Sequence, residues 1–269
     1  MIHVSAVGHG RRYEEYGVLS RVSGRIRTIG SHRGEEPSAP SASPTSGLSG
    51  LARKGEQGAV SRWLIAGFVL LLGALALAVL ATGEGTLPSD IAIARAVQWP
   101  ASGTIDTAAR VLSLIGADIP STLVLALIGV ALLILAGRRD LAQFLGVAAA
   151  LRAIGPVLKV LIASPRPTVD AVVIVAKADG LGFPSGHAMG AALFYGALAI
   201  IAPQVVANRV IARSIQIGAM TLMALIAISR VRLGVHWPSD VAGGLLFGLA
   251  IVCFWQAAFL QWRKARLIT

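Results

Sequence analysis

The stretch WLIAGFVLLLGALALAVLA, residues 63–81, runs for nineteen residues without a charged side chain. As a helix, it is about long enough to cross the roughly 30 Å hydrocarbon core of a membrane. Five further apolar stretches follow it, at about residues 121–136, 141–162, 188–202, 215–228 and 241–262. The sequence therefore predicts an all-α integral membrane protein with six transmembrane helices and both termini on one side of the membrane.

The composition of the whole chain supports this fold class. Of the 269 residues, 55% are hydrophobic and 14% are charged, whereas soluble domains average about 45–50% and about 25%. Together with a mean hydropathy of +0.73, these values exclude a soluble domain and a disordered chain. The single cysteine, Cys253, excludes an intramolecular disulfide framework and is expected to be a small apolar residue of the last span.

Three segments outside the spans have compositions of their own. Residues 1–58 are rich in Arg, Ser, Gly and Pro, which predicts a disordered basic N-terminal arm before a six-span domain over residues 59–269. Four glutamates in this arm argue against a targeting peptide. Between the first two spans, residues 89–98 and 104–116 carry apolar side chains at helical spacing, interrupted by charges, which predicts short interfacial helices.

The distribution of basic residues predicts the orientation of the spans. Sixteen of the 24 Lys and Arg residues lie before the first span, in the loops after the second and fourth spans, and in the C-terminal tail. By the positive-inside rule, this side is cytoplasmic, and the loops after the first, third and fifth spans face the periplasm or the cell exterior. Because the basic residues follow the membrane side and are not gathered into a groove with stacking aromatics, we expect no nucleic-acid partner.

Three polar clusters lie near the outer ends of the third, fourth and fifth spans. They are KVLIASPRP (residues 159–167), FPSGH (residues 183–187) and SRVRLGVHWPSD (residues 229–240). Together they bring three cations, two histidines, one carboxylate and one helix start to the same face of the membrane. This set of groups is suited to binding and cleaving a phosphate.

The first cluster supplies two cations. Lys159 and Arg166 are separated by Ser164-Pro165, where the chain must leave the helix, so both side chains can turn toward one pocket. The planar fork of Arg matches two phosphate oxygens and Lys adds a mobile charge, so that a Lys with two Arg suits a dianionic group. Alternatively, both residues only mark the outer interface of the membrane by snorkelling.

The second cluster begins the fourth span. Ser185 is a natural N-cap residue, and the free amides of a helix start, with Gly186 allowing close approach, form an anion site. At its edge, a protonated His187 can donate to a leaving oxygen. A capped helix with an interfacial histidine is the alternative.

The third cluster contains a candidate nucleophile. Pro238 suits the first turn of a helix, which places Asp240 in that turn and His236 just before it. A hydrogen bond from the ring to the carboxylate would fix the tautomer and leave the other ring nitrogen nucleophilic. An interfacial His-Trp anchor beside a helix-start Asp is the alternative.

Taken together, the three clusters resemble the type 2 phosphatidic acid phosphatase superfamily, which includes lipid phosphate phosphatases. Its signature is Lys, six residues, then Arg-Pro; Pro-Ser-Gly-His; and Ser-Arg, five residues, His, three residues, Asp. Every defining position is matched in order, and the resemblance covers roughly residues 60–262. The matching residues are Lys159, Arg166, Pro167, the stretch from Pro184 to His187, Ser229, Arg230, His236 and Asp240.

The resemblance implies a role for each matched side chain. His236 attacks phosphorus and forms a phosphohistidine, Asp240 holds its ring, and His187 protonates the leaving oxygen and later deprotonates water. The remaining residues hold the phosphate oxygens: Lys159, Arg166, Arg230, Ser185 and the amide of Gly186. The family transfers phosphate without a metal, so no metal or other cofactor is expected.

Arg152 belongs to none of the three clusters. It lies seven residues before Lys159, about two turns deeper and on the same face of the helix. A charge at that depth indicates a functional site by default. It either contacts a second phosphate or a headgroup, or it pairs with an acidic residue in a structural role.

The sequence thus predicts a membrane lipid phosphatase of the cell (inner) membrane with its active site facing outward. Candidate substrates are undecaprenyl pyrophosphate, phosphatidic acid and phosphatidylglycerol phosphate. A lipid phosphotransferase using the same histidine is one alternative. The other is a non-enzymatic anion or lipid transporter, which the intact His236 and Asp240 disfavour because anion binding alone requires no nucleophile.

Overall fold

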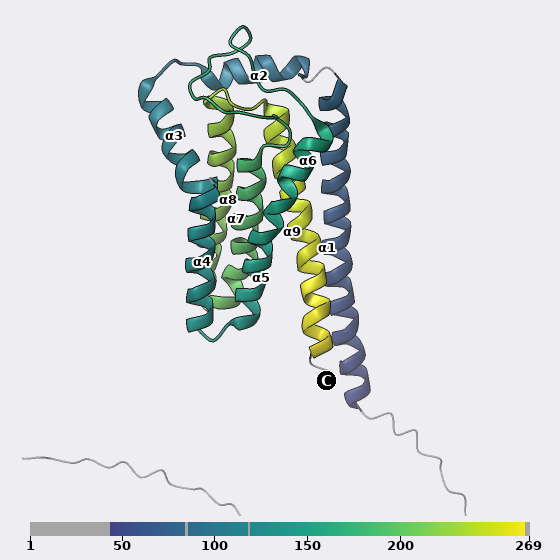
Figure 1. Ribbon diagram of the computed structural model, residues 1–269. Coiled ribbons are helices and arrows are strands. Elements are labelled where there is room, and N and C mark those ends of the chain that lie inside the picture. The colour runs from purple at the N-terminus through teal and green to yellow at the C-terminus, as the bar shows by residue number, and fades with distance from the viewer. Residues whose placement is uncertain (1–43, 84–85, 118, 267–269) are drawn as a thin grey trace, which may run out of the picture. The chain divides into compact units, whose positions relative to one another are not determined.

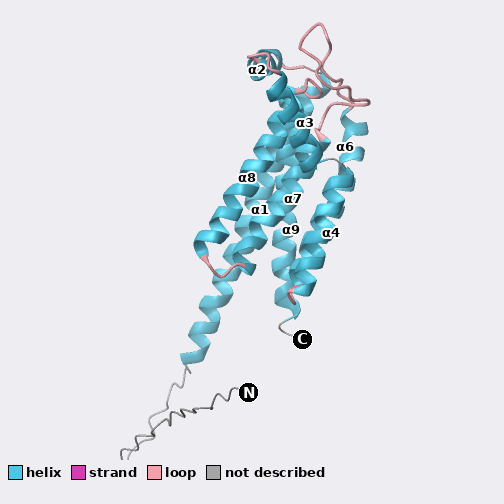
Figure 2. Cartoon of the chain, turned by 90° about the vertical axis from the view of Figure 1, so that its left-hand side faces the viewer, coloured by secondary structure: helices cyan, strands magenta, loops and turns pink. Residues whose placement is uncertain are grey.

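The computed structural model describes residues 44–83, 86–117 and 119–266, and within these ranges the chain is helical without strands. Figure 1 and Figure 2 show the helices as one bundle with loops at its two ends. The elements are α1 (Pro44–Gly83), α2 (Pro88–Gln98), α3 (Gly103–Ala117), α4 (Ile119–Leu135), α5 (Arg139–Ala150), the 3₁₀ turn η1 (Leu151–Ala153), α6 (Ile154–Ile162), α7 (Gly186–Val205), α8 (Arg209–Arg232) and α9 (Pro238–Arg266).

Helix α7 lies at the centre of the bundle. It packs against α8 and α9, with α5 and α3 on its other sides, while α1 runs alongside α9. Aromatic side chains of α5, α7 and α9 meet in the main core, where Phe144 stacks near Trp255 and Phe259. The outward faces remain apolar: Leu72, Leu127 and Val160 are each more than 60% exposed. Such a surface fits lipid and not water.

Close contact between α7 and α9 depends on two glycines one helical turn apart. A Cβ at Gly244 would lie 2.6 Å from the backbone oxygen of Ser185, and one at Gly248 would lie 2.7 Å from that of Met189. This small-xxx-small spacing lets the two helix backbones approach each other. It also brings the start of α9, which carries Asp240, against the start of α7.

Five of the described helical stretches are long and apolar enough to cross a membrane: 57–82, 139–162, 186–205, 209–232 and 238–266. The second stretch that the sequence predicted as a span forms α4, which has 17 residues. A helix of this length rises about 25 Å, at the lower limit for a span. The described structure therefore contains five clear candidate spans and a shorter sixth apolar helix.

The third predicted span, 141–162, is not one regular helix. It consists of α5, η1 and α6, and the irregular turn lies just before Pro156. Proline has no amide hydrogen and its ring clashes with the carbonyl four residues earlier, which here belongs to Arg152. Pro156 thus explains why the 3₁₀ turn forms at Arg152 and changes the course of the helix.

Two boundaries differ from those predicted. Helix α1 begins at Pro44, so the last part of the segment 1–58 is helical; residues 1–43 of the predicted arm lie outside the described residues. Of the two helices predicted to be interfacial, α2 lies across the end of the bundle, whereas α3 descends along α8 and α7 toward α4 (Figure 1). These neighbours bury Ala109 and Ser113 of α3, whereas Ile105, Val111 and Leu114 stay exposed.

Candidate active site

The three polar clusters meet at the end of the bundle that carries α2. A cavity of about 240 Å³ opens between α6, α7, α8 and the segment before α9. Its lining residues include the predicted cations and histidines: Arg152, Gly155, Pro156, Lys159, Arg166, Ala178, Gly186, His187, Met189, Arg230 and His236. Residues up to 84 positions apart in sequence, Arg152 and His236, therefore line one small space.

His236 and Asp240 are in contact, as their spacing predicted. The Nδ1 of His236 lies 3.3 Å from Oδ2 of Asp240, and the same oxygen accepts from the amide of Trp237 at 2.9 Å. On the other side of the ring, Nη1 of Arg166 lies 3.3 Å from Nε2. Since a guanidinium only donates, Nε2 carries the lone pair and Nδ1 carries the proton. In this tautomer Nε2 carries the lone pair that a nucleophile requires, and its contact with Arg166 has to break before it can attack phosphorus.

Burial and the surrounding cations also favour an uncharged imidazole. The pKa of His236 is lowered well below its ordinary value, first by burial and then by the charges of Arg166, Lys159 and Arg230. A neutral ring is the form that can attack phosphorus. The carboxylate of Asp240 orients this ring, and it is itself fully buried.

Arg166 is held in place by backbone oxygens of the loop between α6 and α7. Its Nε donates to the carbonyls of Asp179 and Gly180 at 3.2 and 3.0 Å, and its Nη1 donates to Val235 at 2.6 Å. Burial lowers the pKa of this guanidinium from its ordinary value, although the group remains a cation at neutral pH. These contacts fix the side chain across the mouth of the cavity.

The other two predicted cations enter from different helices. Lys159, in the last turn of α6, donates to the carbonyls of Leu181 and Gly182 at 2.6 and 3.1 Å. Arg230, near the end of α8, is buried and donates through Nη1 to the hydroxyl of Ser113 on α3. Three cations from α6, the loop and α8 thus surround the same space, which is the arrangement required for a phosphate.

The start of α7 is placed as predicted, but its N-cap differs in one respect. Ser185 occupies the N-cap position, yet its hydroxyl makes no capping hydrogen bond, and this fully buried oxygen has no hydrogen-bond partner among the described residues. The next two residues, Gly186 and His187, line the cavity, whereas Ser185 is not among the lining residues. The structure thus brings the helix start and the imidazole to the cavity and leaves the hydroxyl of Ser185 buried outside its lining.

One residue that supports the site was not found from the sequence. Asp90, in the first turn of α2, is only 1% exposed and accepts from the amide and the hydroxyl of Ser239 at 2.8 and 2.6 Å. Ser239 precedes Asp240 at the start of α9. The sequence signal was one acidic residue in the first turn of a short helix, which alone indicates no partner.

The loop over the cavity is fastened by side chains of α2 and α3. The side chain of Gln98 donates to the backbone oxygen of Val173 at 2.6 Å and accepts from the amide of Val173 at 3.1 Å. Arg95 donates to the backbone oxygen of Ala171 at 2.9 Å. Arg232, which the sequence left without a role, forms an ion pair of 2.7 Å with Asp106. These contacts assign Arg232 to holding α3 and α8 together and not to the phosphate site.

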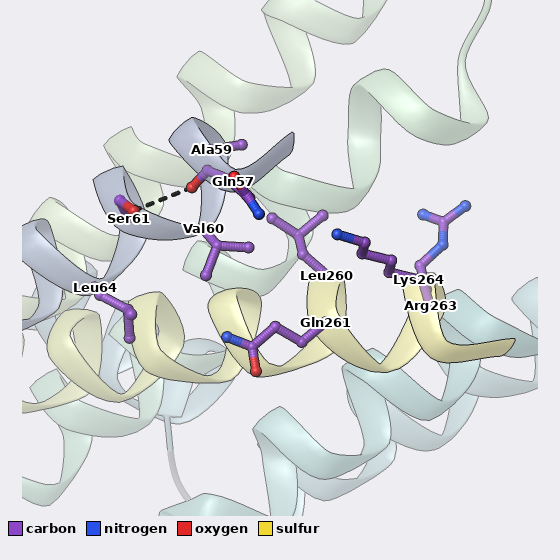
Figure 3. A pocket seen from close by; sticks show the side chains of 9 residues that line it. All are labelled: Gln57, Ala59, Val60, Ser61, Leu64, Leu260, Gln261, Arg263 and Lys264. Carbon is purple, nitrogen blue, oxygen red and sulfur yellow. Dashed lines mark hydrogen bonds between the residues drawn. The ribbon is translucent and has the colours of Figure 1, made fainter. Parts of the chain in front are cut away.

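A larger cavity, of about 770 Å³, lies between α1 and α9 near the C-terminal end of α9, away from the three clusters (Figure 3). It is lined by Gln57, Ala59, Val60, Ser61, Leu64, Leu260, Gln261, Arg263 and Lys264. The hydroxyl of Ser61 there donates to the backbone oxygen of Gln57 at 3.1 Å. This lining includes no histidine and no carboxylate, so the smaller cavity is the candidate active site.

Family comparison agrees with the geometry, because residues 140–264 match the PAP2 superfamily. The chain carries a PAP2 superfamily domain. All three polar clusters lie within the matched range of this PAP2 domain, so the resemblance inferred from the motifs is confirmed. In the described part of the chain, no group of three or more His, Cys, Asp or Glu side chains is placed to hold a metal ion.

Two curated proteins are similar to parts of this chain. A putative undecaprenyl-diphosphatase of Escherichia coli K12, YbjG, is 43% identical over 79 residues, which are 28% of this chain and 35% of the relative. Phosphatidylglycerophosphatase B of Bacillus subtilis 168 is 35% identical over 104 residues, which are 37% of this chain and 48% of the relative. The aligned stretches thus span between about a third and a half of these two relatives.

A solved structure matches over a larger part. The crystal structure of a transmembrane PAP2-type phosphatidylglycerolphosphate phosphatase from Bacillus subtilis aligns with a TM-score of 0.61 and 27% identity, covering 73% of this chain and 96% of that one. Together with the long apolar helices, this match supports a multi-pass membrane protein.

Proposed function

We propose that the chain is a membrane lipid phosphatase that hydrolyses a phosphate monoester or diphosphate through a phosphohistidine. The observation that carries this proposal is the pair His236–Asp240: Asp240 holds the ring at Nδ1, and His236 lines a cavity together with Lys159, Arg166 and Arg230. Binding an anion requires the cations alone. A nucleophile with a buried orienting carboxylate is needed only if a bond to phosphorus forms.

In the first step, the substrate phosphate enters the cavity and accepts hydrogen bonds from the three cations. The Nε2 of His236 forms a bond to phosphorus while the bond from phosphorus to the lipid oxygen breaks, and that oxygen takes the electron pair. His187 gives it a proton. Asp240 stabilises the imidazolium that develops on His236.

In the second step, water replaces the lipid in the cavity. His187 takes a proton from the water, whose oxygen attacks phosphorus as the bond to Nε2 breaks. Inorganic phosphate leaves, and His236 returns to its neutral form. We also propose that the hydroxyl of Ser185 and the amide of Gly186 hold phosphate oxygens during both steps. The position of Gly186 in the lining of the cavity, at the start of α7, supports this role for the amide.

Candidate substrates follow from the named relatives and remain part of the proposal. Undecaprenyl diphosphate, phosphatidylglycerol phosphate and phosphatidic acid all present a terminal phosphate on a lipid. We further propose six membrane crossings, with α4 as the shortest, cytoplasmic termini, and an active site facing the periplasm or exterior of the cell membrane. The basic residues Arg139, Arg209 and Arg263, at the end opposite the cavity, support this orientation.

The decisive experiment is phosphate release by the purified full chain in detergent from these three lipids. We expect release from at least one of them by the wild-type protein and none above background by His236→Ala. Transfer to an added alcohol in place of water, measured as a new phosphate ester, would favour the phosphotransferase. A wild-type protein that binds these lipids and cleaves none would contradict the proposal and favour a transporter.

A further inference from the structure

Arg152 shares the cavity with the proposed phosphate ligands although it lies outside the three clusters. It lines the same space as Lys159 and His187, from a position seven residues before Lys159 on the same segment. Seven residues correspond to about 10 Å along a helix, so Arg152 reaches the cavity from deeper in the membrane. A guanidinium at such a depth is costly, and structures retain it mainly where it has a function.

The backbone of two segments, the turn before Pro156 and α7 at Gly190, determines where the side chain of Arg152 lies. Pro156 produces the 3₁₀ turn that carries Arg152. The Nη1 of Arg152 donates to the hydroxyl of Thr122 on α4 at 3.2 Å. On α7, a Cβ added at Gly190 would overlap the guanidinium of Arg152. The absence of a side chain at Gly190 therefore allows the guanidinium to lie directly on the backbone of α7.

The position of Gly190 also shows which part of the site Arg152 serves. Residues three apart on a helix are neighbours on its surface, so Gly190 lies beside His187. His187 is the proposed donor to the leaving oxygen, whereas Lys159, Arg166 and Arg230 surround the phosphate that is transferred. Arg152 is thus on the side from which the leaving group departs.

We propose that Arg152 binds a second phosphate of the substrate, the one that stays on the lipid when the terminal phosphate is transferred. This inference rests on the proposed phosphatase function and makes Arg152 the residue that selects lipids with two phosphates. With a diphosphate, the bond from phosphorus to the bridging oxygen breaks and the electron pair remains on the lipid phosphate. A phosphate of this kind has a second pKa of about 6, so it can leave without a proton if a cation stabilises it.

Two kinds of lipid present a second phosphate. In undecaprenyl diphosphate it is bonded directly to the transferred phosphate, and in phosphatidylglycerol phosphate it is a phosphodiester beyond the glycerol. Phosphatidic acid has a single phosphate and serves as the reference substrate. Comparison of the three separates an effect on the second phosphate from a general loss of activity.

The test measures kcat/KM for these three lipids with Arg152→Gln, using Arg139→Gln at the exposed start of α5 as the matched control. We expect Arg152→Gln to lower kcat/KM by about 10²-fold for substrates with a second phosphate, and by less than about threefold for phosphatidic acid. A loss confined to the diphosphate, or confined to phosphatidylglycerol phosphate, identifies which second phosphate is bound. Equal losses on all three lipids, or no loss on any, would overturn the inference.

A second variant tests the position of the guanidinium while its charge is kept. Gly190→Ala displaces the side chain of Arg152 and should reproduce the selective loss. Arg152→Lys should recover part of the kcat/KM that Arg152→Gln loses on lipids with a second phosphate. If Arg152→Gln does not fold, these two variants decide the question in the same way. A wild-type protein that cleaves none of the three lipids would refute the phosphatase proposal itself, which is distinguishable from a wild-type enzyme whose variants show no selectivity.

The leaving group gives an independent check. An alkoxide leaves both phosphatidic acid and phosphatidylglycerol phosphate and needs the proton of His187, whereas a lipid phosphate leaves the diphosphate. His187→Asn should therefore reduce the rate of phosphoenzyme formation from the two monoesters by at least tenfold more than from the diphosphate. This first step precedes the attack of water, in which His187 serves every substrate alike. A similar reduction of this step for all three lipids would show that Arg152 does not stabilise the leaving phosphate.

Discussion

The carboxylate of Asp90 binds both the backbone amide and the hydroxyl of Ser239, at 2.8 and 2.6 Å. The carboxylate also accepts from the amide of Leu87, the residue just before α2, at 3.0 Å, and this contact fixes its position. A negative charge is favourable at the start of a helix, here the start of α9. Asp90 thereby joins α2 to the turn that carries Asp240, and it acts on His236 only through that turn.

Replacing Asp90 should therefore affect both stability and rate. Asp90→Asn keeps the shape but turns one acceptor into a donor that faces the donors of Ser239, so we expect a loss of about 1–3 kcal/mol in unfolding free energy. We also expect kcat to fall by roughly tenfold, because a misaligned His236 that raises the activation free energy by about 1.4 kcal/mol has that effect on the rate. Thermal unfolding and phosphate release check the two effects, with the exposed neighbour Ser89→Ala as control. Unchanged stability in Asp90→Asn would contradict this role.

The two histidines should differ in which step they affect. His236→Ala should abolish turnover, since loss of a nucleophile costs on the order of 10⁴-fold or more. His187→Ala should still form some phosphoenzyme from a substrate with a good leaving group, because its proton is then not required. Rapid quenching with radiolabelled phosphate substrate, at neutral or alkaline pH, detects the acid-labile adduct. Near-normal turnover by His236→Ala would reject the assignment of the nucleophile.

The titration of His236 should depend on its neighbouring cations. Burial and the charge of Arg166 lower the pKa of His236, so the ring should remain neutral at pH 6 in the substrate-free protein. Removing one positive charge makes protonation easier, and Arg166→Gln should therefore raise the pKa of His236. NMR of ¹³C-labelled histidine follows this titration, and the signal lost in His236→Ala assigns it. A pKa that stays the same or falls in Arg166→Gln would contradict the proposed contact.

Activity should not require a metal ion. Lys159, Arg166, Arg230 and the start of α7 supply the positive charge that a metal would otherwise bring to the phosphate. We therefore expect full activity in EDTA and inhibition by orthovanadate, which forms the five-coordinate geometry of the transferred phosphorus. Assays of phosphate release in each condition measure both effects. Loss of activity in EDTA that magnesium restores would count against this mechanism.

The sequence predicted the site better than it predicted the helix ends. Lys159, His187 and Asp240 each lie within the first or last turn of a helix, so motif spacing was enough to bring them to one face. The predicted span 215–228 was too short because polar residues such as Arg213 and Arg230 lower hydropathy without ending the helix. Helix α8 accordingly extends over Arg209–Arg232.

Contacts between distant segments could not be predicted in this way. Asp90 and Ser239 are 149 residues apart, and Arg230 and Ser113 are 117 apart, so neither pair leaves a local pattern. The 3₁₀ turn at Arg152 did leave a signal, since Pro156 disrupts the helix four residues earlier. That the guanidinium rests on Gly190 of another helix depends on packing between helices, which hydropathy does not describe.

The orientation of the site in the membrane can be tested without reference to activity. The basic residues of the α4–α5 turn, the α7–α8 turn and the end of α9 lie at the end opposite the loop over the cavity (Figure 1). With the buried Cys253 changed to serine, single cysteines at the exposed positions Lys177 and Arg139 report on the two ends. A membrane-impermeant maleimide applied to intact cells should label position 177 and spare position 139, while permeabilised cells should show both. The reverse pattern would place the cavity on the cytoplasmic side, and the substrate would then have to be a lipid of the cytoplasmic leaflet.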